Sequence, residues 1–521
     1  MQTAFSALDA AIIAVYLAVL TGVGVYFSRR QQTLDQYFLA RQSMTWLPVG
    51  LSLMAALDSA IDYLMQPSST IKYGLILLVG TSSWLLLYPW VAHVTLPFYR
   101  RLNYYTAYEY LEARFDVRVR SLAAGIFIVW RLGWMATAIY VPCLAISAAT
   151  GGQIPLGPTV LVLGCIVTLY TALGGVQAVI WNDVIQFCVR FGGLTAVVAI
   201  AASSVPGGLG EIWRVADAAG KTTIIAPIAG ASGGILAQVQ AFFEQPLNIV
   251  AIMCSLVFGR MASYVGDQIM VQRLQTTKSL ADARKAFIVN AAGDIIWMFA
   301  LSFVGLALFA YFQLHTLPPD FSTDKILPYF MSLTFPRGIV GLVIASIMAS
   351  SLSSVDSAIN SCTSVVVVDF YNRLWLRRQT RHQLSGAEQR HEVVVSRVAT
   401  VAFGAAGTLL ATNVSRIGSL LEIANKLINA FTGPLFGIYL LAMFSRRATA
   451  TPTLVAGIAG SMVSYFVAYH TSIGFMWPST FGLAATLIVG GAMTAVSGSR
   501  PTADALQLTW RHVTLAVEGS R

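Results

Sequence analysis

The sequence is poor in charge and in residues of reactive chemistry. Only 11% of its 521 residues are charged and 56% are hydrophobic, whereas soluble proteins carry about 25% charged residues. This deficit excludes a water-soluble globular protein and indicates a polytopic membrane protein. The five cysteines lie in apolar stretches without disulfide or metal spacing, so we expect small buried residues. The six histidines are scattered and no HExxH or GxSxG motif occurs, so an enzyme is not expected.

Long apolar windows fill the chain. A window of about 20 mostly apolar residues crosses a bilayer as a helix, and about 13 such windows occur here. The predicted fold class is therefore an all-α polytopic membrane protein with about 13 transmembrane helices. The windows lie at residues 8–28, 46–66, 75–98, 121–144, 156–173, 176–202, 238–259, 287–312, 338–362, 394–412, 416–443, 452–469 and 476–496.

Lys and Arg gather in alternate loops between these windows. Loops rich in Lys and Arg face the cytoplasm, so we expect the N-terminus outside and the C-terminus inside. The net charge of +10 then reflects membrane topology, and no nucleic-acid partner is expected. The rich loops contain Arg29, Arg30, Arg100, Arg101, Arg114, Arg118, Arg273, Lys278, Arg284, Lys285, Arg373, Arg377, Arg378, Arg381, Arg446 and Arg447.

Two windows are interrupted by polar residues at matching places. Asp58 and Ser59 interrupt GLSLMAALDSAIDYLMQP, and Asp267 interrupts MASYVGDQIMVQR. Broken helices at corresponding places in two halves of a transporter mark a binding site near the bilayer midplane. We therefore expect inverted five-helix repeats at about 46–202 and 238–443. They belong to one membrane domain over 1–498, followed by a short cytoplasmic tail over 499–521.

Several carboxylates lie within apolar windows. Each costs roughly 2.5–3.5 kcal/mol at the centre of a membrane helix, so an ion, a partner or a cavity must compensate. Arg131, Arg190 and Lys426 are candidate counter-charges, and a structural ion pair is the alternative interpretation for any single carboxylate. The six carboxylates are Asp58, Asp62, Asp183, Asp267, Asp294 and Asp356.

The segment ASSLSSVDSAIN, residues 349–360, carries a stripe of hydroxyl groups. Ser350, Ser353, Ser354 and Ser357 follow an i, i+3, i+4, i+7 pattern and share one helix face. Hydroxyl and carbonyl oxygens suit a hard cation, and neutral oxygens suit a weakly held monovalent one. Close helix packing through small residues is the competing interpretation.

The chain resembles the sodium/solute symporter family, in the branch of the iodide, multivitamin and monocarboxylate carriers. The resemblance extends over roughly residues 10–445. It implies a leucine-transporter-type core with one helix before and two after, and sodium-driven uptake of a small organic solute by alternating access. The motifs that carry it are GLSLMAALDSAI, PFYRRL, TAYEYLEARF, IYVPCLAISAATG, YTALGGVQAVIWNDVIQ, QIMVQRLQTTKSLADARKAF, SSVDSAINS, VVVVDFYNR and FTGPLFGIYLL.

The resemblance also implies ion sites. The common sodium site maps to the carbonyl groups of Ala55, Asp58 and Ser350 and the hydroxyl groups of Ser353 and Ser354. A second site, present in some members, maps to Asp183, Ser353, Asp356 and Ser357. Some relatives carry serine where this chain has Asp356, and two carboxylates there either strengthen cation binding or share a proton. One or two Na⁺ ions are expected, and no organic cofactor.

Solute positions of the family face the same cavity, and three departures suggest the solute class. Asp62 replaces a neutral residue, Asp267 stands where Asn is usual, and Trp134 takes the place of a carboxylate-binding Arg in the sialic acid carriers. A cavity with added carboxylates favours an amine-bearing or zwitterionic solute, with Trp134 as a cation–π wall. Lys426 argues partly against this, because it can neutralise an Asp or bind a carboxylate. The mapped positions are Ser59, Asp62, Thr81, Trp134, Asp267, Gln268 and Lys426.

Other functions compete with this interpretation. A sodium- or proton-coupled carrier of a monocarboxylate, vitamin or sugar is the nearest alternative. A solute channel or a transport-dead membrane sensor belongs to a different class. We expect the partners to be the solute and the lipid bilayer, in a bacterial inner membrane, with the chain as a monomer or a loose homodimer.

Overall fold

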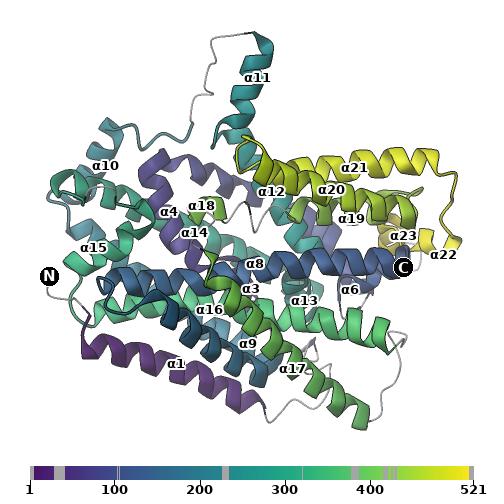
Figure 1. The fold of residues 1–521 in the computed structure, drawn as a ribbon, viewed down its shortest axis with the longest axis horizontal. Helices are drawn as coiled ribbons and strands as arrows, with labels where there is room; N and C mark the ends of the chain where they lie inside the picture. The colour runs from purple at the N-terminus through teal and green to yellow at the C-terminus, as the bar shows by residue number, and fades with distance from the viewer. Residues whose placement is uncertain are drawn as a thin grey trace.

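The protein is built of helices packed side by side (Figure 1). The computed structural model describes residues 5–28, 42–102, 104, 106–225, 234–318, 321–376, 386–414, 420–423, 426 and 431–515. Over these ranges no β-strand forms, and the single isolated bridge joins Met44 to Thr277. The all-α prediction is therefore confirmed.

Eleven helical segments among the described residues are long and apolar enough to cross a membrane, and two shorter apolar helices accompany them. The first apolar window becomes α1 (Ala7–Ser28). The remaining long helices are α8 (Val117–Ala149), α9 (Leu156–Ser203), α12 (Ile249–Gly266), α14 (Leu280–Leu314), α16 (Ile339–Val365), α17 (Gly386–Ala411), α20 (Ala450–His470) and α21 (Pro478–Val496).

The second apolar window is broken near residue 58, and the part after the break continues into the third window as one helical path. The path starts with α4 (Ala60–Tyr73) and continues through a 3₁₀ helix, η2 (Gly74–Ser82). Gly74 has φ 73°, which bends the chain, and a Cβ there would lie 2.7 Å from the carbonyl oxygen of Lys221. The path then runs through α5 (Ser83–Trp90), the π-helical η3 (Val91–Thr95) and α6 (Leu96–Leu102).

Two other windows differ from the prediction. The window 238–259 is divided between α11 (Ile235–Glu244) and α12, with a cap at Asn248, whose side chain accepts a hydrogen bond from the amide of Ala251. Within 416–443 the structure describes α18 (Leu420–Ile423) and α19 (Thr432–Phe444), and much of this window lies outside the described residues.

The long helix α16 lies at the centre of the molecule. Nearly all of its residues are buried, and it packs against α9, α8, α17 and α1. Small side chains allow this close approach, because a Cβ at Gly193 of α9 would lie 2.3 Å from that of Ser346. The carboxylate of Asp9 on α1 also accepts hydrogen bonds from the amides of Gly338 (2.8 Å) and Gly341 (2.6 Å). The serine stripe is thus held in the protein interior and does not face lipid.

Short helices close the two ends of the helical body. The helices α10 (Gly208–Ala218) and α15 (Ile326–Thr334) lie at one end in Figure 1, with the single turn η4 (Thr323–Lys325) between α14 and α15. The other end carries α22 (Ala503–Gln507) and α23 (Trp510–Leu515), and α7 (Glu109–Arg114) packs against α22.

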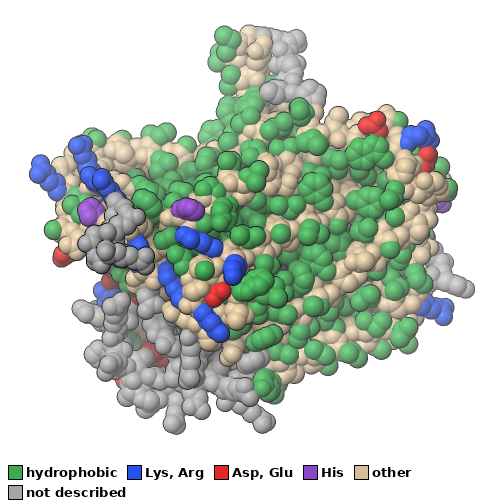
Figure 2. Space-filling view, turned by 180° about the vertical axis from the view of Figure 1, so that it is seen from behind, with side chains coloured by type: hydrophobic (Ala, Val, Ile, Leu, Met, Phe, Trp, Pro, Cys, Tyr) green, Lys and Arg blue, Asp and Glu red, His purple; other side chains and the backbone are tan. Residues whose placement is uncertain are grey.

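The described part of the tail packs on the helical body. The indole of Trp510 donates a hydrogen bond to the carbonyl of Val94 (3.2 Å), and Arg101 donates one to the carbonyl of Val513 (2.8 Å). Figure 2 shows a broad lateral face of hydrophobic side chains, as expected for a surface in lipid.

Candidate functional site

The first break divides α3 (Trp46–Leu57) from α4. Asp58 and Ser59 have extended backbones, with φ,ψ of −90°,130° and −121°,177°. Ser59 caps α4, since its hydroxyl accepts a hydrogen bond from the amide of Ile61, while the Asp62 carboxylate accepts one from the amide of Ser59 (2.8 Å). The predicted break in this helix is confirmed. Because no helix continues past Leu57, the last carbonyl groups of α3 lack their usual partners.

The second break lies between α12 and α13 (Gln268–Gln275). Asp267 is extended between them, with φ −88° and ψ 114°, and its carboxylate caps α13 at the amide of Ile269 (2.9 Å). This predicted break is also confirmed. Each second half therefore begins with an aspartate: Asp62 lies in the first turn of α4, and Asp267 caps α13.

The serine stripe of α16 meets the first break. The Ser353 hydroxyl donates a hydrogen bond to the carbonyl oxygen of Ala55 (2.8 Å), and the Ser354 hydroxyl lies 3.5 Å from the same oxygen. Both hydroxyls also reach the carbonyl of Ser350, at 3.3 and 3.5 Å. All four residues are buried. Four neutral oxygens from two helices thus converge, which is a ligand set suited to a monovalent hard cation.

Asp58, the fifth residue mapped to the sodium site, contacts an arginine and not the serine stripe. The carbonyl oxygen of Asp58 accepts a hydrogen bond from Arg190 of α9 (2.9 Å), and the Asp58 carboxylate lies 3.9 Å from the same guanidinium. Arg190 also lies over the ring of Trp297, 4.6 Å from its centroid. Arg190 therefore anchors the broken segment to α9, as a counter-charge of the kind that the sequence suggested.

The residues mapped to a second ion site also lie together. Asp356 accepts hydrogen bonds from Tyr170 and Ser357, both at 3.3 Å. Asp183 accepts one from Ser52 (2.5 Å), and one of its oxygens has no hydrogen-bond partner among the described residues.

A guanidinium that the sequence analysis placed in a loop lies inside this cluster. Arg273 of α13 is fully buried and donates to Ser52 (2.7 Å), Asp183 (3.1 Å) and Ser357. The loop assignment of Arg273 is therefore wrong, because α13 extends the broken helix inward past Asp267. The available signal was its position six residues after the second break, on the same short helix.

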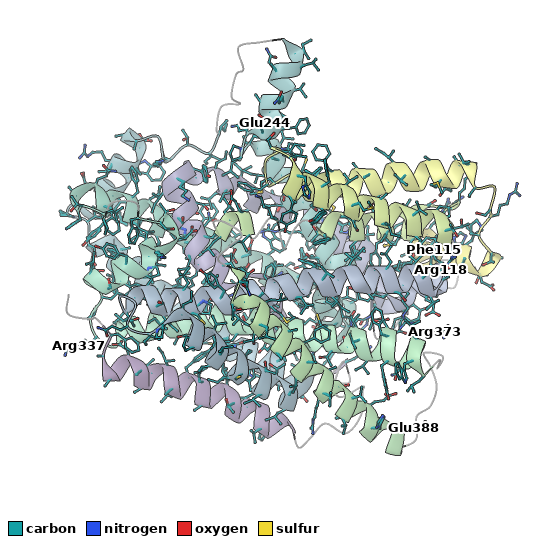
Figure 3. The ribbon with its side chains drawn as sticks, in the orientation of Figure 1. Phe115, Arg118, Glu244, Arg337, Arg373 and Glu388 are labelled. Carbon is teal, nitrogen blue, oxygen red and sulfur yellow. The ribbon has the colours of Figure 1, made fainter. Side chains whose placement is uncertain are left out.

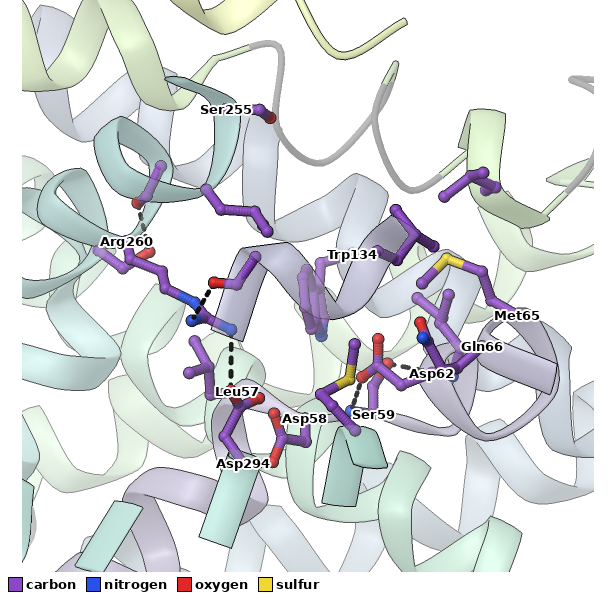
Figure 4. A pocket seen from close by; sticks show the side chains of 18 of the residues that line it. Leu57, Asp58, Ser59, Asp62, Met65, Gln66, Trp134, Ser255, Arg260 and Asp294 are labelled. Carbon is purple, nitrogen blue, oxygen red and sulfur yellow. Dashed lines mark hydrogen bonds and ion pairs between the residues drawn. The ribbon is translucent and has the colours of Figure 1, made fainter. Parts of the chain in front are cut away.

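A cavity opens beside the first break (Figure 4). The cavity has a volume of about 180 Å³. Ser59, Asp62, Thr81 and Trp134 line it, as the mapped solute positions predict. Apolar walls complete the cavity, and they include Met65, Leu77, Trp130, Leu256, Met298, Leu421 and Met476.

Three mapped solute positions do not line this cavity. The carboxylate of Asp267 pairs with Arg131, and the side-chain carbonyl of Gln268 accepts a hydrogen bond from the amide of Ala107 (2.9 Å). Lys426 lies near α20, where the Tyr469 hydroxyl donates to its carbonyl (3.3 Å).

Two arginines line the cavity, and each is already paired. Arg131 bonds Asp267 and lies over the rings of Trp130 and Trp134, 4.4 and 5.3 Å from their centroids. The Trp134 ring therefore already contacts a cation of the protein itself.

The second arginine, Arg260, lies at the other side of the cavity from Asp62 in Figure 4. It pairs with Asp294 (2.9 Å) and donates to Ser83 (2.8 Å). Sequence reasoning did not single out Arg260, since it lies within an apolar helix and pairs with a residue 34 positions away.

Asp62 and Asp356 differ from the other four carboxylates of this region. Asp58, Asp183, Asp267 and Asp294 each pair with an arginine, at 3.9 Å or closer. Neither Asp62 nor Asp356 forms an ion pair with a described residue. Of the two, Asp62 lines the cavity, and its carboxylate accepts the capping bond from the Ser59 amide. Asp62 therefore offers a carboxylate to whatever enters the cavity.

Comparisons with known proteins agree with this arrangement. The model of the sodium:solute symporter family matches residues 37–460. The sodium/sialic acid symporter SiaT of Proteus mirabilis is 30% identical over 506 residues, covering 94% of this chain and 95% of that protein. The sodium-dependent multivitamin transporter of Oryctolagus cuniculus is 31% identical over 534 residues, covering 96% and 78%.

A solved structure shares the whole fold. A Na⁺-coupled sialic acid symporter in a substrate-bound outward-open state matches with a TM-score of 0.84 and 28% identity, over 95% of this chain and 99% of that one. The leucine-transporter-type fold is thus confirmed, and the chain is a transporter with Na⁺ as coupling ion, not an enzyme. This integral membrane protein belongs to the sodium:solute symporter family.

Proposed function

We propose that this protein carries a solute with a positively charged amine group into the cell together with Na⁺. The ion binds to the carbonyl oxygens of Ala55 and Ser350 and the hydroxyls of Ser353 and Ser354. The solute binds beside it in the cavity, with its cationic group at Asp62. Asp267 and Gln268, which we expected to contact the solute, instead hold the second broken helix in place.

A count of the charges around the two breaks supports this proposal. The described region around the two breaks holds six carboxylates and four guanidinium groups, which leaves two negative charges without a balancing cation. Asp356 is buried and Asp62 is half-buried beside the cavity, so a bound cation near each of them is favourable. One Na⁺ and one amine group supply two positive charges. The groups are Asp58, Asp62, Asp183, Asp267, Asp294 and Asp356 against Arg131, Arg190, Arg260 and Arg273.

Coupling follows from where the two ligands bind. Na⁺ joins the end of α3 to α16, and the solute binds at the start of α4, across the same break. The ion therefore fixes the geometry of the segment that holds the solute, and each ligand raises the affinity for the other by the same factor. Each Na⁺ entering releases about 2.3 kcal/mol at 100 mV and about 1.4 kcal/mol for a tenfold gradient.

The direction of transport and the setting in the membrane also belong to this proposal. Arg118 and Arg373 lie at one end of the helical body and Arg337 at the other (Figure 3), which supports a cytoplasmic end near α7 and the start of α8. We infer that the N-terminus lies outside and the tail inside, in a bacterial inner membrane, since sialic acid symporters of two bacteria are among the relatives. The chain contains a complete cavity by itself, which is consistent with a working monomer.

A ligand screen on the purified protein tests the solute class. Thermal unfolding is measured with amines, zwitterions and monocarboxylates, each in NaCl and in choline chloride. We expect stabilisation by compounds with an amine group, in NaCl alone. Stabilisation by plain monocarboxylates would contradict the proposal and favour the alternative carrier function, for which Arg260 offers a cationic group at the cavity wall.

A further inference from the structure

The guanidinium of Arg273 lies among the residues mapped to a second Na⁺ site. It donates to Asp183 (3.1 Å) and Ser357, two of the four residues mapped to that site. It also donates to Ser52 (2.7 Å), which itself bonds the same carboxylate oxygen of Asp183 (2.5 Å). These four residues come from α13, α9, α16 and α3, so one side chain connects four helices.

An arginine in this position excludes a free cation from the same oxygens. Its charge is permanent and its donors form a planar fork, so it satisfies a carboxylate and neighbouring hydroxyls at once. A Na⁺ bound to the same oxygen of Asp183 would lie within a few ångströms of the guanidinium, with strong repulsion in an interior of low dielectric. The hydroxyl of Ser357 is likewise engaged by Arg273 and by the carbonyl of Ser353.

We propose that Arg273 acts as a built-in cation in place of a second Na⁺, so that the protein binds one Na⁺ per transport cycle. The inference rests on the proposed sodium site at Ala55 and Ser354.

A tethered cation has a different role from an ion that passes through. It cannot leave with the solute, so it contributes no driving force from the Na⁺ gradient. It does hold α13, the second half of a broken helix, to α9 and α16 throughout the cycle. The coupling ratio is then fixed by the chain itself and does not depend on the ion concentration.

Equilibrium binding of radioactive Na⁺ to the full-length chain in lipid nanodiscs tests this inference. We expect one ion per wild-type chain. Arg273→Gln removes the built-in cation and leaves Asp183, Asp356 and Ser357 free for a second ion, so we expect two ions per chain. Arg273→Lys keeps the charge and should bind one.

The outcomes separate this inference from the proposed sodium site. Two ions per wild-type chain would overturn it, whether or not the Arg273→Gln variant folds. One ion in a folded Arg273→Gln variant would also overturn it. The double variant Ser354→Ala, Arg273→Gln should bind one ion, at the second site, where Arg273→Gln alone binds two. If wild type binds no Na⁺ but Arg273→Gln binds one, the role of Arg273 as a built-in cation is supported. The site at Ala55 and Ser354 then fails, and with it the ratio of one Na⁺ per cycle.

Discussion

The hydroxyl of Ser353 donates a 2.8 Å hydrogen bond to the carbonyl oxygen of Ala55, across 298 positions of sequence. The bond connects the central helix α16 to the last turn of α3, where the helix stops and its carbonyl groups lose their intrahelical partners. A hydroxyl also has two acceptor lone pairs, so the same oxygen can bind Na⁺ once its proton turns away from the carbonyl. Na⁺ binding therefore draws on groups that already hold the broken helix against α16.

Replacement of Ser354 by Ala should weaken Na⁺ binding selectively. One neutral oxygen ligand is lost, which is worth about 1.4 kcal/mol or a tenfold rise in the Na⁺ concentration needed for half-maximal thermal stabilisation. Ser351→Ala is the matched control, because Ser351 lies on the same helix and donates instead to the carbonyl of Ala138 on α8. Equal Na⁺ dependence in both variants would show that the site is assigned to the wrong residues.

Replacement of Asp62 by Asn should remove the charge and keep the fold. The Asn oxygen can still accept the capping bond from the Ser59 amide, so α4 stays capped. A charged hydrogen bond to the solute is worth about 1.5–3 kcal/mol, so the affinity for an amine compound should fall roughly 10- to 150-fold. Binding is measured by thermal shift in NaCl, with Asp116→Asn, at the exposed pair with Arg118, as control. An unchanged affinity would refute the role of Asp62.

Arg131→Met should strongly destabilise the protein. The variant leaves the fully buried Asp267 carboxylate without its partner, and breaking a buried pair costs about 3–5 kcal/mol. The double variant Arg131→Met, Asp267→Leu should recover much of this loss, since no buried charge remains. The midpoints of thermal unfolding of the two variants provide the comparison. A double variant no more stable than Arg131→Met would mean that the pair is not an isolated ionic contact.

The paired carboxylate of Glu112 should stabilise the fold at neutral pH, and this contribution should be lost in acid. Partial burial raises the pKa of this carboxyl. Hydrogen bonds from Arg373 (2.7 Å) and Arg120 (2.8 Å) lower the pKa by a larger amount, so it lies below the usual value. A group with a lowered pKa stabilises the fold above its unfolded-state pKa, about 4.3, and the stability is lost as the pH falls through the folded-state value.

The comparison of wild type with Glu112→Gln measures this effect. The gap between their unfolding midpoints should be constant at neutral pH and shrink below about pH 4.3. A gap that stays constant down to acid pH would show that the carboxylate does not contribute through its charge.

Sequence patterns located the site better than they described its electrostatics. Polar interruptions at Asp58 and Asp267 predicted both breaks, because a carboxylate in the middle of an apolar helix is costly unless it serves a site in the protein interior. The i, i+3, i+4 spacing likewise placed Ser353 and Ser354 on one face. Arg273 was assigned to a loop because Lys and Arg near the end of an apolar window usually lie at the membrane surface.

Sequence patterns could not predict which charged residues pair when they lie far apart in the sequence. Asp267 pairs with Arg131, which lies 136 positions earlier, so an expected solute contact proved to be a structural ion pair. Arg190 meets the Asp58 carbonyl over a separation of 132 positions. Such pairs follow from the packing of α8, α9 and the broken helices, and local spacing carries no signal for them.

The most direct test of the sodium site is a high-resolution structure determined by cryo-electron microscopy in NaCl and again in choline chloride. We predict a density peak in NaCl between Ala55, Ser350, Ser353 and Ser354, and its loss in choline. A map in NaCl in which the Ser353 hydroxyl still bonds the Ala55 carbonyl, with no peak between these oxygens, would contradict the account.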